Sequence, residues 1–188
     1  QRINLKTSGI TTVLVENDRI GLAQMSANLF GHPSKELITI AITGTKGKTT
    51  TSCMIKSILD YAGLKAGLIG TLGVVVDDEI IKLNNTTPES YEIQKYLRYM
   101  VDKKCKSAVL EASSLGLREN RLTGITFDYG VFTNLSEDHI GGNEHKDMDE
   151  YIRSKNMLFK MCKTGIVNAD DSYLPRIIDG HNCRLKTF

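Results

Sequence analysis

Apolar and polar positions alternate along the chain in blocks that predict strands and helices in turn. Continuous apolar runs predict strands at 37–42, 64–69, 108–110 and 129–132. Runs without polar alternation are typical of strands that are covered on both faces, as in parallel sheets with helices on each side. The segments between them carry apolar residues at helical spacing. The pattern therefore predicts an α/β fold with a mostly parallel sheet and flanking helices.

Three amphipathic stretches after the first strand predict helices that pack on this sheet. Their apolar stripes are Met54, Ile55, Ile58 and Leu59, with Lys56 and Asp60 outward; Ile93, Tyr96, Leu97, Met100 and Val101; and Met148, Tyr151, Ile152, Leu158, Phe159 and Cys162. The remaining patterns predict a strand at 11–16, a helix at 18–30, and a hairpin of 74–76 with 80–83 around Asp77-Asp78.

Composition narrows the class of protein without identifying a function. The 188 residues suffice for one substantial core, and a net charge of +2 gives no reason to expect nucleic acid or an acidic membrane as a partner. The four cysteines form no C-x-x-C pair, which suits a reducing, cytoplasmic compartment. No run is apolar enough to span a bilayer, and no secretory signal precedes the first helix. We expect a piece of a longer protein, because the chain starts at Gln1 and stops just after a possible strand.

A glycine-rich stretch follows the first predicted strand and opens the first predicted helix after it. It comprises Gly44, Thr45, Lys46, Gly47, Lys48, Thr49 and Thr50. Glycines allow backbone N–H groups to approach phosphates, a lysine reaches the β and γ oxygens, and a hydroxyl residue holds Mg²⁺. Lys48 and Thr49 have the residue types for the last two roles. The pattern is a short version of the phosphate-binding loop, because Ile42 stands where the usual motif has glycine.

Polar residues follow two further strands at the place where ligands bind in parallel sheets. Glu111 ends one apolar run, and Asn134 follows another, so both are expected near a magnesium nucleotide on the loop. Lys155 interrupts the apolar stripe of the last helix. Its ammonium either reaches water along the helix surface, which spacing alone favours, or has an anionic or chemically altered role. His139 could be a metal ligand or a proton carrier, and His145 could equally be the useful histidine.

Taken together, these motifs closely resemble the Mur ligases, and among them the branch that adds the third residue of the peptidoglycan stem peptide. The similarity extends from about residue 37 to 171. The matching segments are 43–50, Asn85-Thr86-Thr87-Pro88, Glu111-Ala112-Ser113-Ser114, Phe132-Thr133-Asn134-Leu135, Asp138-His139-Ile140-Gly141, Lys155 and Asn168-Ala169-Asp170-Asp171.

The resemblance implies an ATP-dependent ligase that activates the carboxylate of UDP-N-acetylmuramoyl-L-alanyl-D-glutamate as an acyl phosphate and joins it to a diamino acid. ATP and Mg²⁺ are the implied cofactors. Lys48, Lys155 and His139 are the implied catalytic residues. The implied metal ligands are Thr49, Glu111, His139 and Lys155, the last as a carbamate formed with CO₂. The loop residues 44–50 and Asn134 are expected to bind the nucleotide.

The resemblance also implies a binding site for the UDP-muramoyl dipeptide, formed by Asn85, Thr86, Thr87, Ser113 and Arg121. Two positions depart from the family pattern. Lys46 stands where asparagine is common, and Glu119 stands where glutamine is frequent, so Glu119 is left out of the expected site. The segment from Asp138 to His145 leans towards relatives that use lysine rather than diaminopimelate.

By the same resemblance, residues 1–36 are expected to end a UDP-binding domain, and residues 37–188 to form a truncated ATP-binding domain without the domain that follows it. We expect this monomeric piece to be inactive alone. Two alternatives remain: another ligase of the superfamily, of the folylpolyglutamate or cyanophycin synthetase type, and a phosphate-loop nucleotide-binding module that never activates a carboxylate. The Asn85–Pro88 segment favours the muramoyl substrate over the first alternative.

Overall fold

A computed structural model describes residues 12–137, 141 and 145–188 of the chain. One eight-stranded sheet runs through it in the order β4-β3-β2-β5-β1-β6-β7-β8. The strands are β1 (Ile38–Thr43), β2 (Ala66–Gly70), β3 (Gly73–Val76), β4 (Glu79–Ile81), β5 (Ser107–Glu111), β6 (Phe127–Phe132), β7 (Cys162–Val167) and β8 (Arg184–Thr187). In this spatial order, the six strands β2, β5, β1, β6, β7 and β8 pair in parallel. At the other edge, β3 and β4 add an antiparallel hairpin next to β2. The predicted fold class is confirmed.

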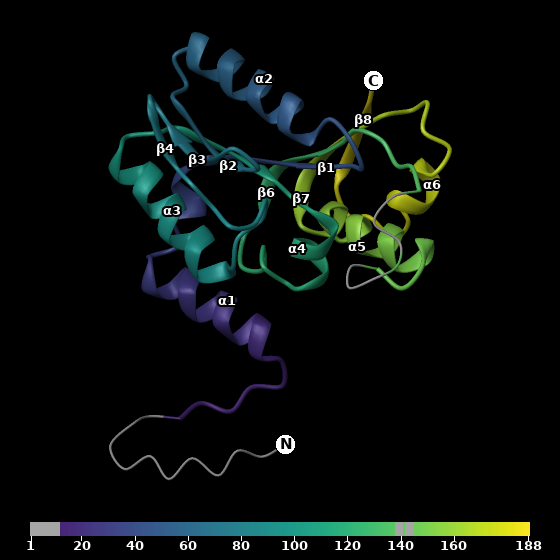
Figure 1. Cartoon of the computed structure of the whole chain (residues 1–188), viewed down its shortest axis with the longest axis horizontal. Helices are drawn as coiled ribbons and strands as arrows, with labels where there is room; N and C mark the ends of the chain where they lie inside the picture. The colour runs from purple at the N-terminus through teal and green to yellow at the C-terminus, as the bar shows by residue number, and fades with distance from the viewer. Residues whose placement is uncertain (1–11, 138–140, 142–144) are drawn as a thin grey trace.

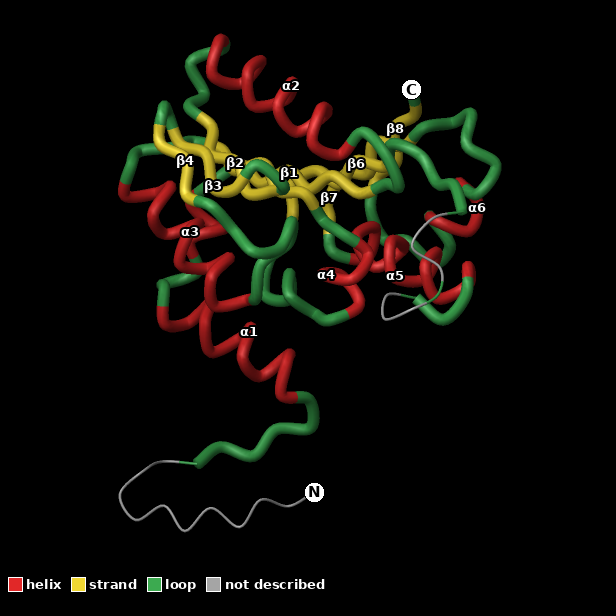
Figure 2. Tube along the Cα trace, viewed as in Figure 1, coloured by secondary structure: helices red, strands yellow, loops and turns green. Residues whose placement is uncertain are grey.

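Helices cover the two faces of the sheet unequally. They are α1 (Asp18–Leu29), α2 (Lys48–Tyr61), α3 (Ser90–Asp102), α4 (Ser114–Arg118), α5 (Met148–Lys160) and α6 (Leu174–Ile177), with a short 3₁₀ turn at Pro33–Glu36. Figure 1 shows α2 alone above the sheet, while α3, α4 and α5 lie below it. Figure 2 shows α1 beyond α3, on the side away from the sheet, and the two helices are in contact.

The hydrophobic core divides between these two faces. The larger cluster joins strand residues such as Ile69 and Phe132 to Leu97 of α3 and Phe159 of α5. The smaller cluster lies under α2 and consists of Ile40, Ile42, Val109 and Val131, with Ile55, Leu59 and Ile166 packed against it. The central strands are thus covered on both faces, as expected for a parallel sheet, and their carboxyl ends meet at one edge.

The structure corrects several details of the predicted elements. Residues 12–17 form no strand, and Leu14 is 95% exposed because no neighbouring strand lies there to pair with it. On α2 no residue of the expected stripe is fully buried, and only Ile55 and Leu59 are partly buried. Met54 and Ile58 are exposed, because a single helix on this face touches the sheet along a narrow line. Cys162 belongs to β7 rather than to the last helix.

Candidate active site

The glycine-rich loop connects the end of β1 to the first turn of α2. Gly44 has a φ of 154°, and a Cβ there would meet the Thr133 hydroxyl oxygen at 2.0 Å, so the close approach of these two strand ends requires glycine. Gly47 is the N-cap of α2 with a φ of 83°. The loop therefore ends at a helix N-terminus, where exposed N–H groups and the helix dipole favour phosphate.

Asn134 fixes the middle of this loop from the end of β6. Its side-chain amide accepts a hydrogen bond from Lys46 N at 3.0 Å and donates one to Lys46 O at 3.0 Å. The backbone carbonyl oxygen of Asn134 accepts from Thr45 N at 2.9 Å, and the Thr133 hydroxyl also donates to Lys46 O at 2.9 Å. Asn134 thus lies where the sequence placed it, beside the loop, and its visible contacts are with the loop backbone. Direct contact with a nucleotide stays a prediction.

Two lysines converge on one carbonyl oxygen of the loop. The Lys48 ammonium donates to Gly44 O at 2.9 Å, and the Lys155 ammonium donates to the same oxygen at 2.9 Å. Lys155 is 1% exposed and its nitrogen lies 4.4 Å from the centre of the Tyr151 ring. The idea that Lys155 reaches bulk water is therefore wrong, because α5 buries the whole side chain against the loop. Two positive charges at one point favour an anion there.

Glu111 presents a buried carboxylate beside the loop. It is 1% exposed, and its Oε2 accepts a hydrogen bond from the Thr49 hydroxyl at 3.0 Å. Thr71, which follows β2, donates its backbone N–H to Oε1 at 3.0 Å and its hydroxyl to Oε2 at 3.1 Å. The predicted metal pair of Thr49 and Glu111 is thus in direct contact. His139 lies outside the described residues.

This donor set fits Mg²⁺ that arrives with a nucleotide. Within residues 12–137, 141 and 145–188, no group of three or more histidine, cysteine, aspartate or glutamate side chains could hold a metal. Mg²⁺ does not require such a cage, because it keeps several waters and binds through one or two carboxylates together with substrate phosphates. A single carboxylate and a hydroxyl at the end of a phosphate loop match that mode of binding.

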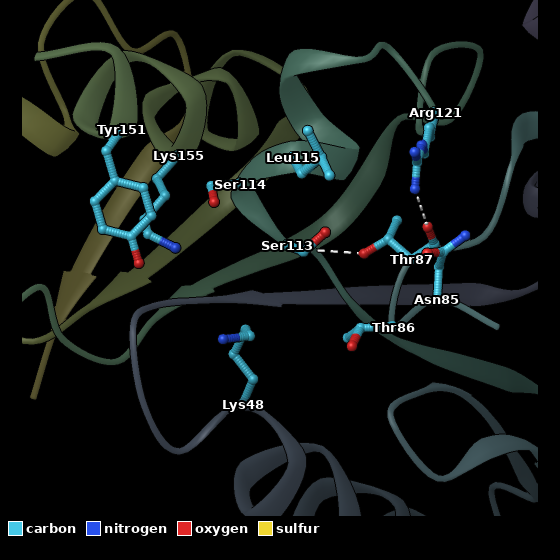
Figure 3. A pocket seen from close by; sticks show the side chains of 10 residues that line it. All are labelled: Lys48, Asn85, Thr86, Thr87, Ser113, Ser114, Leu115, Arg121, Tyr151 and Lys155. Carbon is cyan, nitrogen blue, oxygen red and sulfur yellow. Dashed lines mark hydrogen bonds between the residues drawn. The ribbon is translucent and has the colours of Figure 1, made fainter. Parts of the chain in front are cut away.

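A pocket of about 230 Å³ opens beside the loop. Its lining residues are Lys48, Asn85, Thr86, Thr87, Ser113, Ser114, Leu115, Arg121, Tyr151 and Lys155. Figure 3 shows Lys48 and Lys155 on one side of this space and Asn85, Thr87 and Arg121 on the other. All five residues predicted to bind the substrate line the pocket, together with two of the three residues predicted to be catalytic. Their roles in binding stay predictions.

Thr87 and Arg121 also hold this side of the pocket in shape. The Thr87 hydroxyl donates to Glu111 O at 2.7 Å and accepts from Ser113 N at 3.0 Å. Arg121 donates to Thr87 O at 2.9 Å, and its other terminal nitrogen lies 3.2 Å from a carboxylate oxygen of Glu89. Part of the Arg121 charge is therefore already directed to Glu89, and any anion bound in the pocket would share this guanidinium with it.

Residues outside the predicted set also lie at the site, among them Leu115 of the pocket lining. Ser114 and Tyr151 line the pocket, Thr71 holds Glu111, and His145 is 1% exposed with its Nε2 2.8 Å from the Ser114 hydroxyl. Tyr151 also lies 3.1 Å, oxygen to oxygen, from the Thr45 hydroxyl. Its place four residues before Lys155 was a signal, because residues i and i+4 share one helix face. His145, one of the two histidines considered, thus contacts the pocket lining through Ser114.

The described residues contain no helix that is both long and apolar enough to cross a membrane.

A glycine-rich loop between a parallel strand and a helix N-terminus, with an acidic residue ending a neighbouring strand, defines an α/β domain of the phosphate-binding-loop class. The chain matches the Mur ligase middle domain over residues 42–188 and belongs to this family. The family and fold expected from the motifs are therefore confirmed.

Several similar proteins carry the same enzyme name. A UDP-N-acetylmuramoyl-L-alanyl-D-glutamate--2,6-diaminopimelate ligase of Caldanaerobacter subterraneus subsp. tengcongensis is 39% identical over 181 residues, which is 96% of this chain and 37% of the relative. A second, from Clostridium acetobutylicum, is 43% identical over 176 residues, or 94% of this chain and 36% of the relative. The chain thus spans just over a third of the length of these relatives.

Solved structures show the same fold. A ligase of the same name has a TM-score of 0.81 and 26% identity, with 95% of this chain and 38% of that chain covered. A folylpolyglutamate synthase of Mycobacterium tuberculosis, complexed with ADP and AMPPCP, has a TM-score of 0.69 at 14% identity, with 89% of this chain and 46% of that chain covered. At that identity the second likeness concerns the fold alone.

Proposed function

We propose that the chain is the ATP-binding part of a ligase that joins 2,6-diaminopimelate to UDP-N-acetylmuramoyl-L-alanyl-D-glutamate. The observation that carries the proposal is the meeting of Lys48, Lys155 and the Thr49–Glu111 pair around one end of the glycine loop. The pocket that continues from this point is lined by the residues expected to hold the UDP-muramoyl dipeptide. The names of the relatives supply the substrate and the amine.

The contacts of these residues support a separate role for each in binding the nucleotide and the metal. Lys48 and the loop N–H groups would bind the phosphates, and Thr49 with Glu111, which are in contact, would hold Mg²⁺. When bound, the metal neutralises charge on the phosphate oxygens. The substrate carboxylate would take the γ-phosphoryl group of ATP with release of ADP, and the amine would then displace phosphate from the acyl phosphate. Arg121, on the far wall of the pocket, would orient the substrate through an anionic group.

Carbamylation of Lys155 is the finer part of this proposal. A Lys155 carbamate would replace a cation by an anion with two oxygens and would serve as a ligand for a second Mg²⁺, shared with Glu111 and His139. Its support is the complete burial of this lysine beside the loop, where a permanent cation has no access to bulk water. A ¹³C NMR spectrum of the chain under ¹³C-bicarbonate should show a carbamate resonance that Lys155→Met removes. Its persistence in that variant would place the modification elsewhere.

The identity of the amine rests on the relatives. The segment from 138 to 145 leaned towards lysine, whereas the names of the relatives favour diaminopimelate. Residues 138–140 and 142–144 lie outside the described part of the chain, so the structure offers no contact on this point. We adopt diaminopimelate from the relatives. The monomeric state, the cytoplasmic location and the domain boundary near residue 36 stay predictions.

The first test is binding of Mg-ATP to this chain by calorimetry. Lys48→Ala should weaken it at least about 10-fold, which corresponds to ~1.4 kcal/mol. Lys163→Ala removes a lysine at the opposite end of the sheet and is the matched control.

The second test uses the full-length gene product. Phosphate release should require ATP, the UDP-muramoyl dipeptide and diaminopimelate together. If the rate of ATP hydrolysis does not depend on the dipeptide, the alternative of a nucleotide-binding module without ligase activity is supported instead.

A further inference from the structure

We propose that Thr71 is a positioning residue that orients the Glu111 carboxylate for the metal and connects it to the substrate side of the pocket. Thr71 follows β2, while Glu111 ends the neighbouring strand β5. The two residues are 40 positions apart in the sequence and meet only because the sheet pairs their strands. The inference rests on the proposed Mg-ATP site and adds a residue that none of the motifs contains.

The first support is that Thr71 donates a hydrogen bond to each oxygen of the Glu111 carboxylate. The Thr71 backbone N–H donates to Glu111 Oε1 at 3.0 Å, and its hydroxyl donates to Oε2 at 3.1 Å. One residue therefore binds both oxygens and fixes the rotation of the carboxylate plane. The Thr49 hydroxyl, itself a proposed metal ligand, donates to Oε2 at 3.0 Å. The plane of the carboxylate is thus set before any metal arrives.

The second support is the direction of the hydrogen bonds. A hydroxyl has one proton, and an ionised carboxylate only accepts. Since Thr71 donates its proton to Glu111, the 3.1 Å contact between the Thr71 and Thr86 hydroxyls must be donated by Thr86. Thr86 lines the pocket. Its hydroxyl can then only accept from a ligand there, so this wall selects a donor group such as an amide N–H or a metal-bound water.

The third support is the space around the carboxylate. A Cβ on Gly70, the residue before Thr71, would lie 2.2 Å from Glu111 Oε1 and 2.7 Å from its carboxyl carbon. The carboxylate therefore packs directly on the β2 backbone, and the short distance lets Thr71 reach both oxygens. The Thr71 side chain itself is exposed. Replacing it creates no cavity in the core, so the fold should tolerate the substitution.

The experiment measures the affinity of the chain for Mn²⁺ in the presence of saturating ADP, by electron paramagnetic resonance. Thr71→Ala and Thr71→Val remove the hydroxyl, and Thr71→Ser keeps it. Loss of an outer partner of a metal ligand typically weakens metal binding 10- to 100-fold. We expect Ala and Val to raise the dissociation constant at least about 10-fold, and Ser to stay within about threefold of wild type. Thr126→Val, which changes an exposed threonine at the opposite end of the sheet, is the control.

The outcomes separate this inference from the proposed function. If wild type binds Mn-ADP and Thr71→Ala binds it equally well, Thr71 has no positioning role. If wild type binds no nucleotide, the proposed function fails, and a second readout still decides on Thr71. This readout is the melting temperature. Thr71→Ala should lower it by a few degrees when Glu111 is present, and by less when Glu111 has been replaced by Gln. Equal changes in melting temperature with and without Glu111 would show that Thr71 does not act on Glu111.

Discussion

Two carboxylates at opposite ends of the sheet are held in different ways. Glu111, at the carboxyl end of β5, accepts hydrogen bonds from the neutral groups of Thr49 and Thr71. Asp128, near the amino end of β6, accepts from Thr39 N at 2.9 Å and also pairs with the Lys163 ammonium at 2.7 Å. Among the described residues, no lysine or arginine forms an ion pair with Glu111.

The difference distinguishes the carboxylate proposed to bind a metal from one that holds neighbouring strands together. Lys163 already neutralises Asp128, so a cation would gain little there. Neutral donors orient Glu111, and none of them is a cation that would compete with a metal for the carboxylate. Burial raises the pKa of Asp128, but the hydrogen bonds from Lys163 and Thr39 outweigh this effect and leave the pKa lowered.

The comparison predicts its largest effect for Glu111→Gln. The substitution keeps the size of the side chain and removes its charge, so Mn²⁺ affinity in the presence of ADP should fall about 100-fold, or ~2.7 kcal/mol. The free energy of unfolding should change by less than ~1 kcal/mol, because the amide can still exchange hydrogen bonds with the surrounding hydroxyls. Paramagnetic resonance and denaturant titration give the two values. Unaltered metal binding would remove Glu111 from the site.

The next effect concerns the space that Glu111 occupies. In Gly70→Ala the new methyl group would overlap the carboxylate, which should cost about 1–3 kcal/mol of stability and displace the metal ligand. Gly70→Ala combined with Glu111→Asp is the matched control, since the shorter side chain makes room for the methyl group. Denaturant titration should show stability partly regained in the double variant. A double variant no more stable than the single one would mean that the carboxylate is not the obstacle.

The same two ends show what the sequence could predict. Most strands were predictable because apolar runs such as 108–110 can be buried only between two covered faces. Glu111 and Asn134 were found because each directly follows such a run, and strand ends meet at one edge. Helix faces were less predictable. Met54 and Ile58 have the right spacing on α2, but the sheet below contacts only one narrow side of that helix.

Thr71 shows the limit of sequence patterns. A threonine after a strand is an ordinary turn residue, and its partner is remote in sequence. Its role depends on β2 lying beside β5, and only the sheet order in the folded chain shows this. Lys155 could be recognised in the sequence because a cation interrupts an apolar stripe. The spacing favoured an ammonium that reaches water, but the side chain is buried.

At the amino end, Asp128→Asn should lower stability by ~1 kcal/mol at neutral pH, because Lys163 loses its charged partner. The pKa of Asp128 is lowered in the folded state, so its contribution is present above the unfolded value of about 3.9 and is lost as pH falls through the folded value. The difference in melting temperature between wild type and the variant should therefore shrink in acid. A difference independent of pH would assign the loss to packing. Mn-ADP affinity should not change.

The smallest effect should come from the partner of Asp128. Lys163 has a side chain that is 66% exposed, so water and salt screen its charge, and Lys163→Gln should cost only ~0.5 kcal/mol. This loss should nearly vanish in 1 M salt, and also in the Asp128→Asn background, where no ion pair remains to be broken. Denaturant titration of wild type, the two single variants and the double variant measures the coupling. A coupling near zero at low salt would show that Thr39 alone holds Asp128. The contrast with Glu111 would then rest on position in the sheet rather than on neutralisation.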